Sequence, residues 1–440
     1  MDDKNALETM NYLRDNGTYR NNRLVYVGNV PFTMKDVLVV APLISTLNIY
    51  DVGGTGEGKT QKAHDIMSLF GDKACFMEGR PDFKSSELLK ELNIEALKTA
   101  KNDKEIMQLT KAVNSHVFVV DEMNRCPPII QNYFFNFFDG KLVHQGKVYK
   151  LGNNDYSFGL ASGNIGNGKY VGTSDSDRAL KDRMHMIVEV DYPDFCTTPL
   201  DDVLIFMGKK DPRTTQGNNY KNMSKEIIDL HNLFKNREIP LILPVIGEYF
   251  HKGLDYLDGT GKHSKRAVKN LWPRINDIKD GNHENKVFPL SKRAIFSAMG
   301  LSQAFKMMAE LRKNEGIGDD IDFFLDSLKF TVPYSGVLAD EFVTQAHNGD
   351  FYSAFDDLMQ GIRIDLGEKK DALSAALIGA NNGMKVPKAL DALVAQEDVS
   401  EWTPVREAVE SFVDYRKENP DGVIKLDSII EETKKEEQSQ

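Results

Sequence analysis

The 440-residue sequence predicts an α/β fold, in which a parallel sheet carries helices on both of its faces. Three observations predict it. Short apolar runs recur along the first half of the chain, helical or long crossover segments separate them, and a glycine-rich loop joins the first run to a helix. A helical lid and a C-terminal helical extension are expected after the sheet. The five expected strands lie near residues 47–52, 73–78, 116–121, 156–161 and 186–191.

The residues before the first of these strands are expected to form a small N-terminal segment. Met1–Arg20 has the composition of a helix, and Leu24–Val27 alternates like a short strand. Met34–Leu47 reads as a helix that leads into the sheet. A domain boundary is therefore placed after residue 34.

A glycine-rich loop follows the first strand and precedes a helix over residues 61–70. It fits the pattern G-x-x-x-x-G-K-[ST], which binds nucleotide phosphates in this strand–loop–helix context. Glycines let the backbone wrap closely around an anion, and the N–H groups at the start of the helix point toward it. The eight residues of the loop are Gly53, Gly54, Thr55, Gly56, Glu57, Gly58, Lys59 and Thr60.

The side chains at the end of this loop have separate expected roles. Lys59 is expected to reach the β- and γ-phosphates, and Thr60 to offer its hydroxyl to Mg²⁺. The buried run Val117–Val120 ends in Asp121 and Glu122. Carboxylates at the C-terminal end of a parallel strand lie where such sheets bind ligands. Asp121 is therefore expected to hold Mg²⁺ through water, and Glu122 to polarise the attacking water.

The residues that follow carry a specific family resemblance. The run Asp121–Gln131, D-E-M-N-R-C-P-P-I-I-Q, resembles the D-E-[IM]-N-R-x-P-P-x-x-Q signature of MoxR-type AAA+ ATPases, in the helix-2-insert branch of AAA+ proteins. The resemblance covers about residues 35–315. It implies a P-loop AAA+ core, a helical lid, and ATP with Mg²⁺ as cofactors.

Three further residues receive roles from this resemblance. Leu160–Asn164 resembles the sensor 1 strand, which implies that Asn164 positions the water, although the family's following proline is missing. Ala179–Met184 resembles the family's L-D-R-F segment. This likeness makes Arg183 the expected arginine finger toward a neighbouring subunit, with Arg178 as the fallback. Leu290–Ala294 resembles the start of the sensor 2 helix, which implies that Arg293 touches the γ-phosphate; Ser291 reads as the N-cap of that helix.

Two inserts lie inside the expected core, one opened by Arg80–Leu89 and one over Gly140–Leu151. The second alternates on both sides of Gln145-Gly146, which predicts a hairpin. In the family, such inserts face the ring pore. Candidate pore contacts are Phe83, Lys84, His144 and Lys147, and the alternative is a surface without substrate contact.

The expected domains follow from these segments. Residues 1–34 form the N-terminal helix and strand, and residues 35–193 form the nucleotide-binding core. Residues 194–335 form the helical lid, and residues 336–430 form the C-terminal helical extension. The charged residues 431–440 are expected to be a disordered tail.

Composition limits the class of protein. No apolar run approaches the roughly 18 residues of a membrane-spanning helix, and the N-terminus lacks a secretory pattern. Cys75, Cys126 and Cys196 have no metal-binding or disulfide spacing, so a reducing cytoplasm is expected. The net charge of −11 disfavours general binding to nucleic acid, although a basic pore inside an acidic ring stays possible.

The resemblance implies a homo-oligomeric ring, often a hexamer, with nucleotide between subunits. It also implies a protein client, for which a von Willebrand factor A-type partner is typical of the family. The leading hypothesis is an ATP-driven remodeller of a protein partner. The alternatives are a nucleic-acid translocase of the restriction or helicase type, and a regulatory ring with slow turnover.

Overall fold

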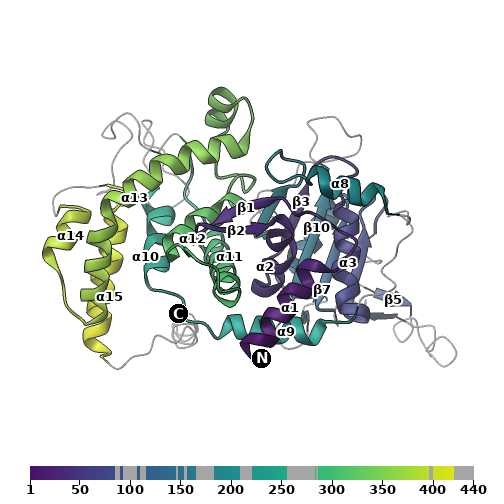
Figure 1. The fold of residues 1–440 in the computed structure, drawn as a ribbon, viewed down its shortest axis with the longest axis horizontal. Helices are drawn as coiled ribbons and strands as arrows, with labels where there is room; N and C mark the ends of the chain where they lie inside the picture. Colours follow the sequence, from purple (N-terminus) through teal and green to yellow (C-terminus); the bar gives the residue numbers. More distant parts are fainter. Residues whose placement is uncertain are drawn as a thin grey trace. The chain divides into compact units, whose positions relative to one another are not determined.

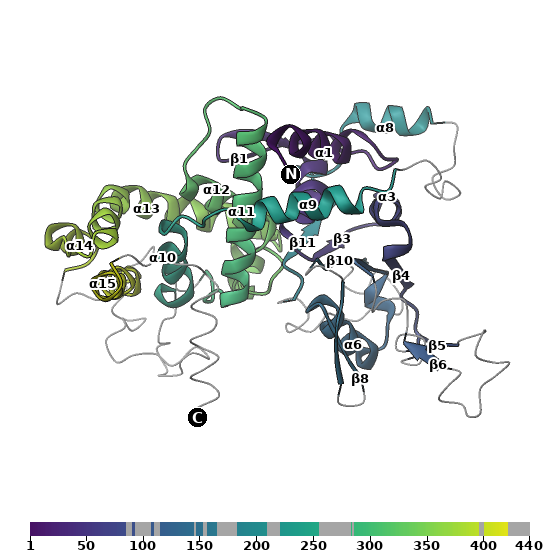
Figure 2. The same cartoon turned by 90° about the horizontal axis from the view of Figure 1, so that it is seen from below.

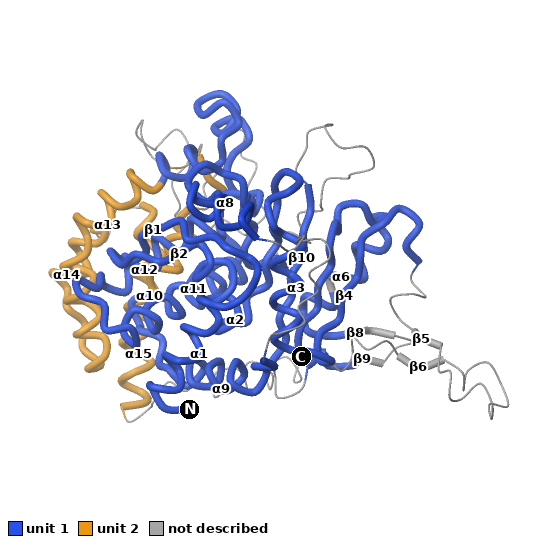
Figure 3. The backbone as a smooth tube through the Cα atoms, turned by 45° about the vertical axis from the view of Figure 1, so that its right-hand side comes forward, with its two compact units in different colours: residues 1–243, 290–358 blue, residues 244–289, 359–440 orange. Residues whose placement is uncertain are grey.

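The protein was analysed as a computed structural model. It describes residues 1–84, 90–92, 107–109, 115–144, 147–152, 156–164, 183–208, 221–254, 283, 286–395 and 400–420. The chain divides into two compact units (Figure 3). The first comprises Met1–Leu243 and Leu290–Leu358, and the second comprises Pro244–Pro289 and Met359–Gln440.

A five-stranded parallel sheet forms the centre of the first unit (Figure 1). The order of its strands in space is β11-β3-β10-β7-β4, so β10 lies between β3 and β7. The predicted α/β class and the five predicted strands are confirmed. The strands are β3 (Ile49–Val52), β4 (Ala74–Glu78), β7 (Val117–Asp121), β10 (Phe158–Gly163) and β11 (Met186–Glu189).

Helices cover both faces of this sheet. Successive side chains of a strand point to opposite faces, and the central strand β7 is buried along its whole length. Val117 and Val119 belong to the same apolar cluster as α3 (Lys59–Phe70), whereas Phe118 and Val120 belong to the cluster of α6 (Pro128–Phe138). The continuous apolar run of β7 is therefore explained by burial on two sides.

The N-terminal segment packs in the first unit. It contains α1 (Asp3–Asp15), a hairpin of β1 (Leu24–Val27) and β2 (Val30–Thr33), and the helical elements η1 (Asp36–Val40) and α2 (Ala41–Ser45). Gly28 and Asn29 both have positive φ, as a two-residue hairpin turn with type I′ geometry requires. The sequence predicted β1 but not β2, because Pro31 argues against a strand.

Two smaller hairpins extend from the core. The predicted hairpin around Gln145-Gly146 is confirmed in its strands, β8 (Lys141–His144) and β9 (Lys147–Lys150), while the turn residues lie outside the described residues. In the first insert, β5 (Lys90–Leu92) pairs with β6 (Met107–Leu109) in an antiparallel ladder.

The remaining described elements of the first unit are helical. Ser291 caps the N-terminus of α11, as predicted, because its hydroxyl accepts a hydrogen bond of 3.0 Å from the Ala294 amide. The elements are η2 (Gly71–Lys73), η5 (Met123–Arg125), α8 (Pro199–Phe206), α9 (Ser224–Lys235), α11 (Lys292–Leu311), α12 (Asp320–Ser327), η8 (Leu328–Phe330) and η9 (Phe342–Ala346).

The described residues of the second unit that lie in regular elements are helical. Its elements include η6 (Tyr249–Gly253), α14 (Pro387–Leu393) and α15 (Thr403–Glu418), and the boundary between the units falls within α10 (Ile242–Glu248) and α13 (Phe351–Asn381). Trp402 Nε1 and the Tyr249 hydroxyl both donate to Asp365 Oδ2, at 2.8 and 3.1 Å. This shared carboxylate joins η6, α13 and the start of α15.

One prediction in this region is corrected. The sequence suggests separate helices over 350–358 and 370–380, but α13 runs through both. Gly361 and Gly367 weaken the helical pattern between them, yet a glycine inside a helix costs only about 1 kcal/mol and packing can offset that cost. In contrast, the sequence predicts a helix over residues 404–416 with Val405, Val409, Phe412 and Val413 on one apolar stripe. In α15 the three valines are buried and Phe412 is half-buried.

No helix among the described residues combines the length and the apolarity needed to cross a bilayer. The domain boundaries expected at residues 194 and 336 stay predictions, and the expected tail over residues 431–440 lies outside the described residues.

Candidate functional site

The carboxyl ends of three neighbouring strands bring the predicted nucleotide residues to one edge of the sheet. The glycine-rich loop follows β3, Asn164 follows β10, and β7 ends in Asp121. Because β10 pairs with both β3 and β7, the residue that follows it lies between the loop and the acidic pair.

The glycine-rich loop has positive φ angles at three of its glycines. Gly53, Gly56 and Gly58 have φ values of 143°, 94° and 74°, which disfavour residues with a side chain. A Cβ on Gly53 would also lie 2.4 Å from Asp191 Oδ1. Asp191, just after β11, accepts a 2.7 Å hydrogen bond from the Gly54 amide. The loop is thus fastened to β11 at its start.

The Lys59 ammonium lies over the loop. It donates to the Gly53 carbonyl at 2.9 Å and to the Gly54 carbonyl, and its distance to Asn164 Oδ1 is 3.4 Å. Burial lowers the pKa of Lys59. The geometry therefore places a partly desolvated cation where the loop's amide groups would hold an anion.

Beside this lysine, hydrogen bonds join the hydroxyl groups of Thr60 and Ser162 to the carboxylate of Asp121. The Thr60 hydroxyl donates to Asp121 Oδ2 at 2.8 Å, and the Ser162 hydroxyl donates to Asp121 Oδ1. Asp121 is only 7% exposed, so these bonds hold its carboxylate in place. Hydroxyl and carboxylate oxygens are the protein ligands that suit Mg²⁺, which keeps waters and phosphate oxygens as its other ligands. The residues present therefore fit the predicted metal.

Glu122 occupies a strained position next to this group. Its φ is 52°, in the left-handed region, and its amide donates to Ser162 Oγ at 3.0 Å. Its side chain is 30% exposed and pairs with Arg125 at 2.9 Å, and burial raises the pKa of the carboxyl. The backbone turn at Glu122 needs Gly79, because a Cβ there would lie 2.2 Å from the Glu122 carbonyl oxygen.

The two remaining predicted arginines meet at Asp139, between α6 and β8. Arg183 Nε lies 3.1 Å from Asp139 Oδ2, and Arg293 Nη2 lies 3.7 Å from Asp139 Oδ1. Arg183 lies three residues before the start of β11, and its carbonyl accepts a 3.1 Å bond from the side chain of Asn48, which precedes β3. These residues therefore lie at the amino ends of the strands, at the edge opposite the glycine-rich loop.

The structure gives different outcomes for the four candidate pore contacts and for the fallback arginine. Phe83 is a correction: it is 8% exposed and packs against Phe134, so its ring belongs to the core rather than to a pore surface. Lys84 is exposed. His144 and Lys147 pair with each other across the β8–β9 hairpin, and Arg178 lies outside the described residues.

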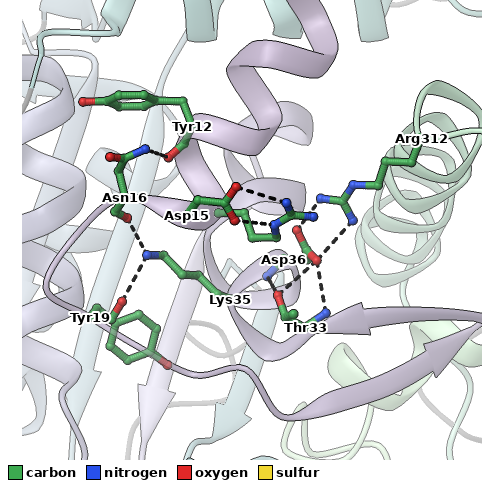
Figure 4. A network of polar contacts seen from close by, with 9 residues as sticks. Tyr12, Asp15, Asn16, Tyr19, Thr33, Lys35, Asp36 and Arg312 are labelled. Carbon is green, nitrogen blue, oxygen red and sulfur yellow. Dashed lines mark hydrogen bonds and ion pairs between the residues drawn. The ribbon is translucent and has the colours of Figure 1, made fainter. Parts of the chain in front are cut away.

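The N-terminal segment borders the loop through Tyr19, which belongs to the network of polar contacts around Lys35 in Figure 4. A Cβ on Gly58 would lie 3.3 Å from the Tyr19 ring, a tight contact that adds to the strain of the positive φ at this position. Lys35 Nζ donates to the Tyr19 carbonyl at 3.0 Å, and Asp65 accepts a 2.7 Å bond from the Tyr19 amide. Burial lowers the pKa of Lys35 to about 8. Next to Lys35, Asp36 forms an ion pair with Arg312, at 2.6 Å.

A buried ion pair lies beneath the loop. Lys62 on α3 approaches Asp51 on β3 at 2.6 Å, and both side chains are 1% exposed. Burial raises the pKa of Asp51 and lowers that of Lys62. Within the described part of the chain, Asp51 Oδ1 accepts no hydrogen bond. The pair therefore links the strand and the helix on either side of the loop, and either charge would be costly alone.

Replacing Lys62 by methionine is expected to lower the free energy of unfolding by about 3–5 kcal/mol, because Asp51 is then buried without its partner. Urea denaturation measures the loss. The deficit should shrink at acidic pH, where protonation of the raised-pKa carboxyl favours the folded state. The double variant Asp51→Asn/Lys62→Met should recover most of the stability, and Lys225→Met on the exposed side of α9 is the control. A single variant as stable as the control would contradict the argument.

Sequence reasoning missed four residues of the two edges. Ser162 lies inside the predicted sensor 1 strand, and Arg125 lies inside the run Asp121–Gln131. Both motifs were identified, but neither residue was given a role. Asp191 lies just after the last strand of the sheet, whereas Asp121 is the last residue of β7, so the rule that polar residues at strand ends bind ligands could have found Asp191 too. Asp139 had no such signal, because only the fold brings it to Arg183 and Arg293.

Two comparisons with known proteins gave matches. Residues 52–184 match the family model described as AAA domain (dynein-related subfamily). A solved structure of a candidate ATPase from Cytophaga hutchinsonii is similar, with 14% identity, a TM-score of 0.49, and coverage of 73% of this chain and 87% of that one. No curated protein matches the sequence. The family match covers the glycine-rich loop and three strands of the parallel sheet, so this part of the chain is similar to an AAA domain.

Proposed function

We propose that this protein is a Mg²⁺-dependent ATPase that works as a ring, with six subunits as in MoxR-type proteins, and that it remodels or matures a protein partner. The observation that carries the proposal is the division of the predicted catalytic residues between two opposite edges of one sheet. Lys59, Thr60, Asp121 and Asn164 lie at one edge, and Arg183 lies at the other.

Binding is assigned to the loop and its lysine. The loop's amide groups and Lys59 offer hydrogen bonds and positive charge to the β- and γ-phosphates. Thr60 and Asp121 would hold Mg²⁺, which supplies charge neutralisation at the phosphates. The hydrogen bonds from Ser162 and Thr60 fix the Asp121 carboxylate before any ligand arrives, which lowers the ordering cost of binding.

Hydrolysis is assigned to Glu122 and Asn164. Glu122 is the side chain that orients a water molecule and accepts its proton, and burial raises the pKa of its carboxyl, which makes it a stronger base. Asn164 is 7% exposed, and its carbonyl accepts a 2.8 Å bond from Asn124. This bond keeps the amide side chain at the end of β10, between Lys59 and the acidic pair.

The position of Arg183 supports a site shared by two subunits. The four residues of β11 separate it from the loop edge, a length of about 13 Å at roughly 3.3 Å per residue. The Arg183 side chain also points to Asp139, away from that edge. An arginine that cannot reach its own nucleotide can serve a neighbour, and assembly then becomes a condition for hydrolysis.

The class of client is proposed from the D-E-M-N-R-C-P-P-I-I-Q run, which resembles MoxR-type proteins. A protein partner, with a von Willebrand factor A-type domain as the first choice, is therefore favoured over nucleic acid. The net charge of −11 agrees with that choice. The proposed compartment is the cytoplasm.

Replacing Glu122 by glutamine is expected to reduce the turnover of ATP by about 10²–10⁴-fold, because the amide cannot accept the proton. The affinity for ATP should stay near that of the wild type, since the amide keeps the shape of the carboxyl. Steady-state hydrolysis and binding of a fluorescent ATP analogue measure the two effects. Rapid turnover by this variant would remove Glu122 from its proposed role.

The same variant, held in its ATP state, tests the client. It is used for affinity capture from native extract of the source cells, with and without nuclease, beside Lys59→Ala as a control that cannot hold ATP. A stoichiometric protein retained after nuclease, by Glu122→Gln alone, is the expected result. Recovery of nucleic acid, or the loss of every partner after nuclease, would favour the translocase instead.

A further inference from the structure

One edge of strand β1 faces away from its partner strand. Among the described residues, the sheet of this strand consists of β1 and β2. In an antiparallel ladder, successive residues direct their backbone groups alternately toward and away from the partner strand. The Met34 amide donates to the Arg23 carbonyl at 2.8 Å, so Val25 also faces β2. The amide and carbonyl groups of Leu24 and Tyr26 therefore face away from it.

These outward groups form an edge to which another strand can pair. The described part of the chain gives the backbones of Leu24 and Tyr26 no partner on this side, and their side chains are 56% and 67% exposed. The outer edge of β2 differs. Pro31 there has no amide hydrogen, and the Thr33 amide donates to Asp36 at 3.1 Å. The hairpin thus blocks one edge and leaves the other available.

A hollow of about 310 Å³ borders this edge. It is lined by residues 23–26, 194–195 and 329–330. Ligand pockets in proteins have volumes of roughly 300–1,000 Å³, so the hollow is large enough to receive side chains of a partner. Two of its lining residues, Phe195 and Phe330, are otherwise buried, and their ring centres lie 5.7 Å apart. Part of its wall therefore belongs to the packed core.

Both ends of β1 are held in place. At the hairpin turn, the Gly28 amide donates to Asp326 at 2.7 Å, and the Gly28 carbonyl accepts a 2.8 Å bond from the Gly318 amide. Figure 2 shows β1 beside α12, which contains Asp326, and Figure 1 shows the same. At the other end, Arg23 Nε donates to the Cys196 carbonyl at 3.1 Å. The edge is therefore ordered in the free protein, which lowers the cost of pairing.

The hollow also contains a cation that has no carboxylate partner among the described residues. Arg23 is half-buried, and its hydrogen bonds go to neutral acceptors of residues 196–197. Lys329, in contrast, is paired with Asp356 at 3.0 Å. Asp194 lines the hollow too, but it is exposed, so solvent screens its charge. A carboxylate that enters the hollow would therefore gain a charge-assisted hydrogen bond at Arg23.

We infer that the outer edge of β1 binds an extended segment of a partner protein, which adds to the β1–β2 sheet as a third strand. Another backbone supplies the alternating donors and acceptors that Leu24 and Tyr26 require. The segment carries alternating apolar side chains, which cover Leu24 and Tyr26, and one acidic side chain, which pairs with Arg23. The inference goes beyond the proposed function, because strand addition needs neither hydrolysis of ATP nor an arginine finger.

A second copy of this chain is the competing occupant, through pairing of two β1 strands. An antiparallel pair centred on Val25 would place Arg23 opposite Val27 of the other copy. The strand Leu24–Val27 contains no carboxylate, so this arrangement leaves the half-buried arginine without a counter-ion. The charge of Arg23 therefore favours an acidic segment of another protein.

The first test uses the full chain as the target of a phage-displayed library of random eight-residue peptides. Enriched peptides are expected to alternate apolar residues and to carry Asp or Glu. The strongest is labelled and titrated by fluorescence anisotropy. Tyr26→Pro removes one outward amide and keeps the bonds to β2, so it should weaken binding at least about 10-fold. Tyr26→Ala keeps the amide and should lose less. No enriched sequence, or equal losses in the two variants, would overturn the inference.

The second test concerns the charge. Arg23→Gln is expected to weaken binding of the selected acidic peptide by about 10-fold, and to leave unchanged the binding of the same peptide with its carboxylate replaced by an amide. The matched control is Arg237→Gln, which removes an arginine that pairs with Glu310. Equal effects of Arg23→Gln on the two peptides, or an equal effect of the control, would overturn the inference.

The third test uses the wild-type chain and so does not depend on the folding of a variant. Hydrogen exchange with residue-resolved mass spectrometry is measured with and without the selected peptide. The peptide should slow exchange of the Leu24 and Tyr26 amides, because both become hydrogen-bonded. Protection that appears elsewhere but not at these two amides would overturn the inference. Protection that rises with the concentration of the chain, without peptide, would identify a second copy as the occupant and overturn it too.

Discussion

Replacing Lys59 by alanine is expected to lower the affinity for ATP by at least about 100-fold and to abolish turnover. The ammonium lies over the loop at 2.9 Å from the Gly53 carbonyl, and in the bound state its donors would turn to phosphate oxygens. A hydrogen bond to a charged group contributes about 1.5–3 kcal/mol, and two such bonds account for the expected loss. Equilibrium titration with a fluorescent ATP analogue measures it.

Two controls make this result interpretable. Lys225→Ala removes an exposed lysine of α9 and should bind as the wild type does. The thermal unfolding of Lys59→Ala without nucleotide should stay close to that of the wild type, because Lys59 is only part-buried and pairs with carbonyls of its own loop. Tight ATP binding by a folded Lys59→Ala protein would contradict the assignment of the loop.

The pH dependence of binding follows from the same lysine. Burial lowers the pKa of Lys59 in the free protein, and the bound phosphates require its charged form. The affinity for ATP should therefore fall as the pH rises through this lowered pKa. The fall should begin at a lower pH than it would if the lysine were exposed and had the ordinary lysine pKa. A flat titration over the alkaline range would show that the lysine charge does not take part in binding.

The parts of this site that sequence predicts are those defined by neighbours in the chain. The glycine-rich loop needs only the local order of Gly53, Gly58, Lys59 and Thr60. The hydrophobic runs place Asp121 and Asn164 at the ends of strands, and parallel pairing brings the ends of strands to one edge. Local pattern and sheet topology thus predict the loop and the ends of its strands, whereas Ser162, Arg125 and Asp191 at the same edge were missed.

The parts that sequence does not predict depend on contacts between distant segments. Asp51 looks like one polar residue inside an apolar strand, and only the packing of α3 on β3 pairs it with Lys62. In the sequence, Asp139-Gly140 indicates only a turn. The ion pairs of Asp139 with Arg183 and Arg293 join segments that are distant in the chain, so the sequence does not reveal them. Phe83 stands among polar residues in the sequence, which suggests an exposed side chain. Its ring nevertheless packs on Phe134, because tertiary packing overrides local composition.

Replacing Arg183 by alanine is expected to reduce turnover by about 10³–10⁵-fold, the range for a missing arginine finger, and to leave ATP affinity unchanged. The matched control is Arg237→Ala, which removes a partly exposed arginine from its ion pair with Glu310, away from both edges. Equal losses in the two variants, or a loss of ATP affinity in Arg183→Ala, would contradict the assignment.

Mixing decides whether Arg183 serves its own subunit or the next one. An Arg183→Ala subunit keeps its loop, and a Lys59→Ala subunit keeps its arginine, so an interface between them contains one complete site. The mixture should hydrolyse ATP faster than either variant alone, with a maximum near equal proportions. An arginine that acted within its own subunit would give no recovery at any ratio, because neither chain then carries a complete set. The strand length between Arg183 and the loop, about 13 Å, favours recovery.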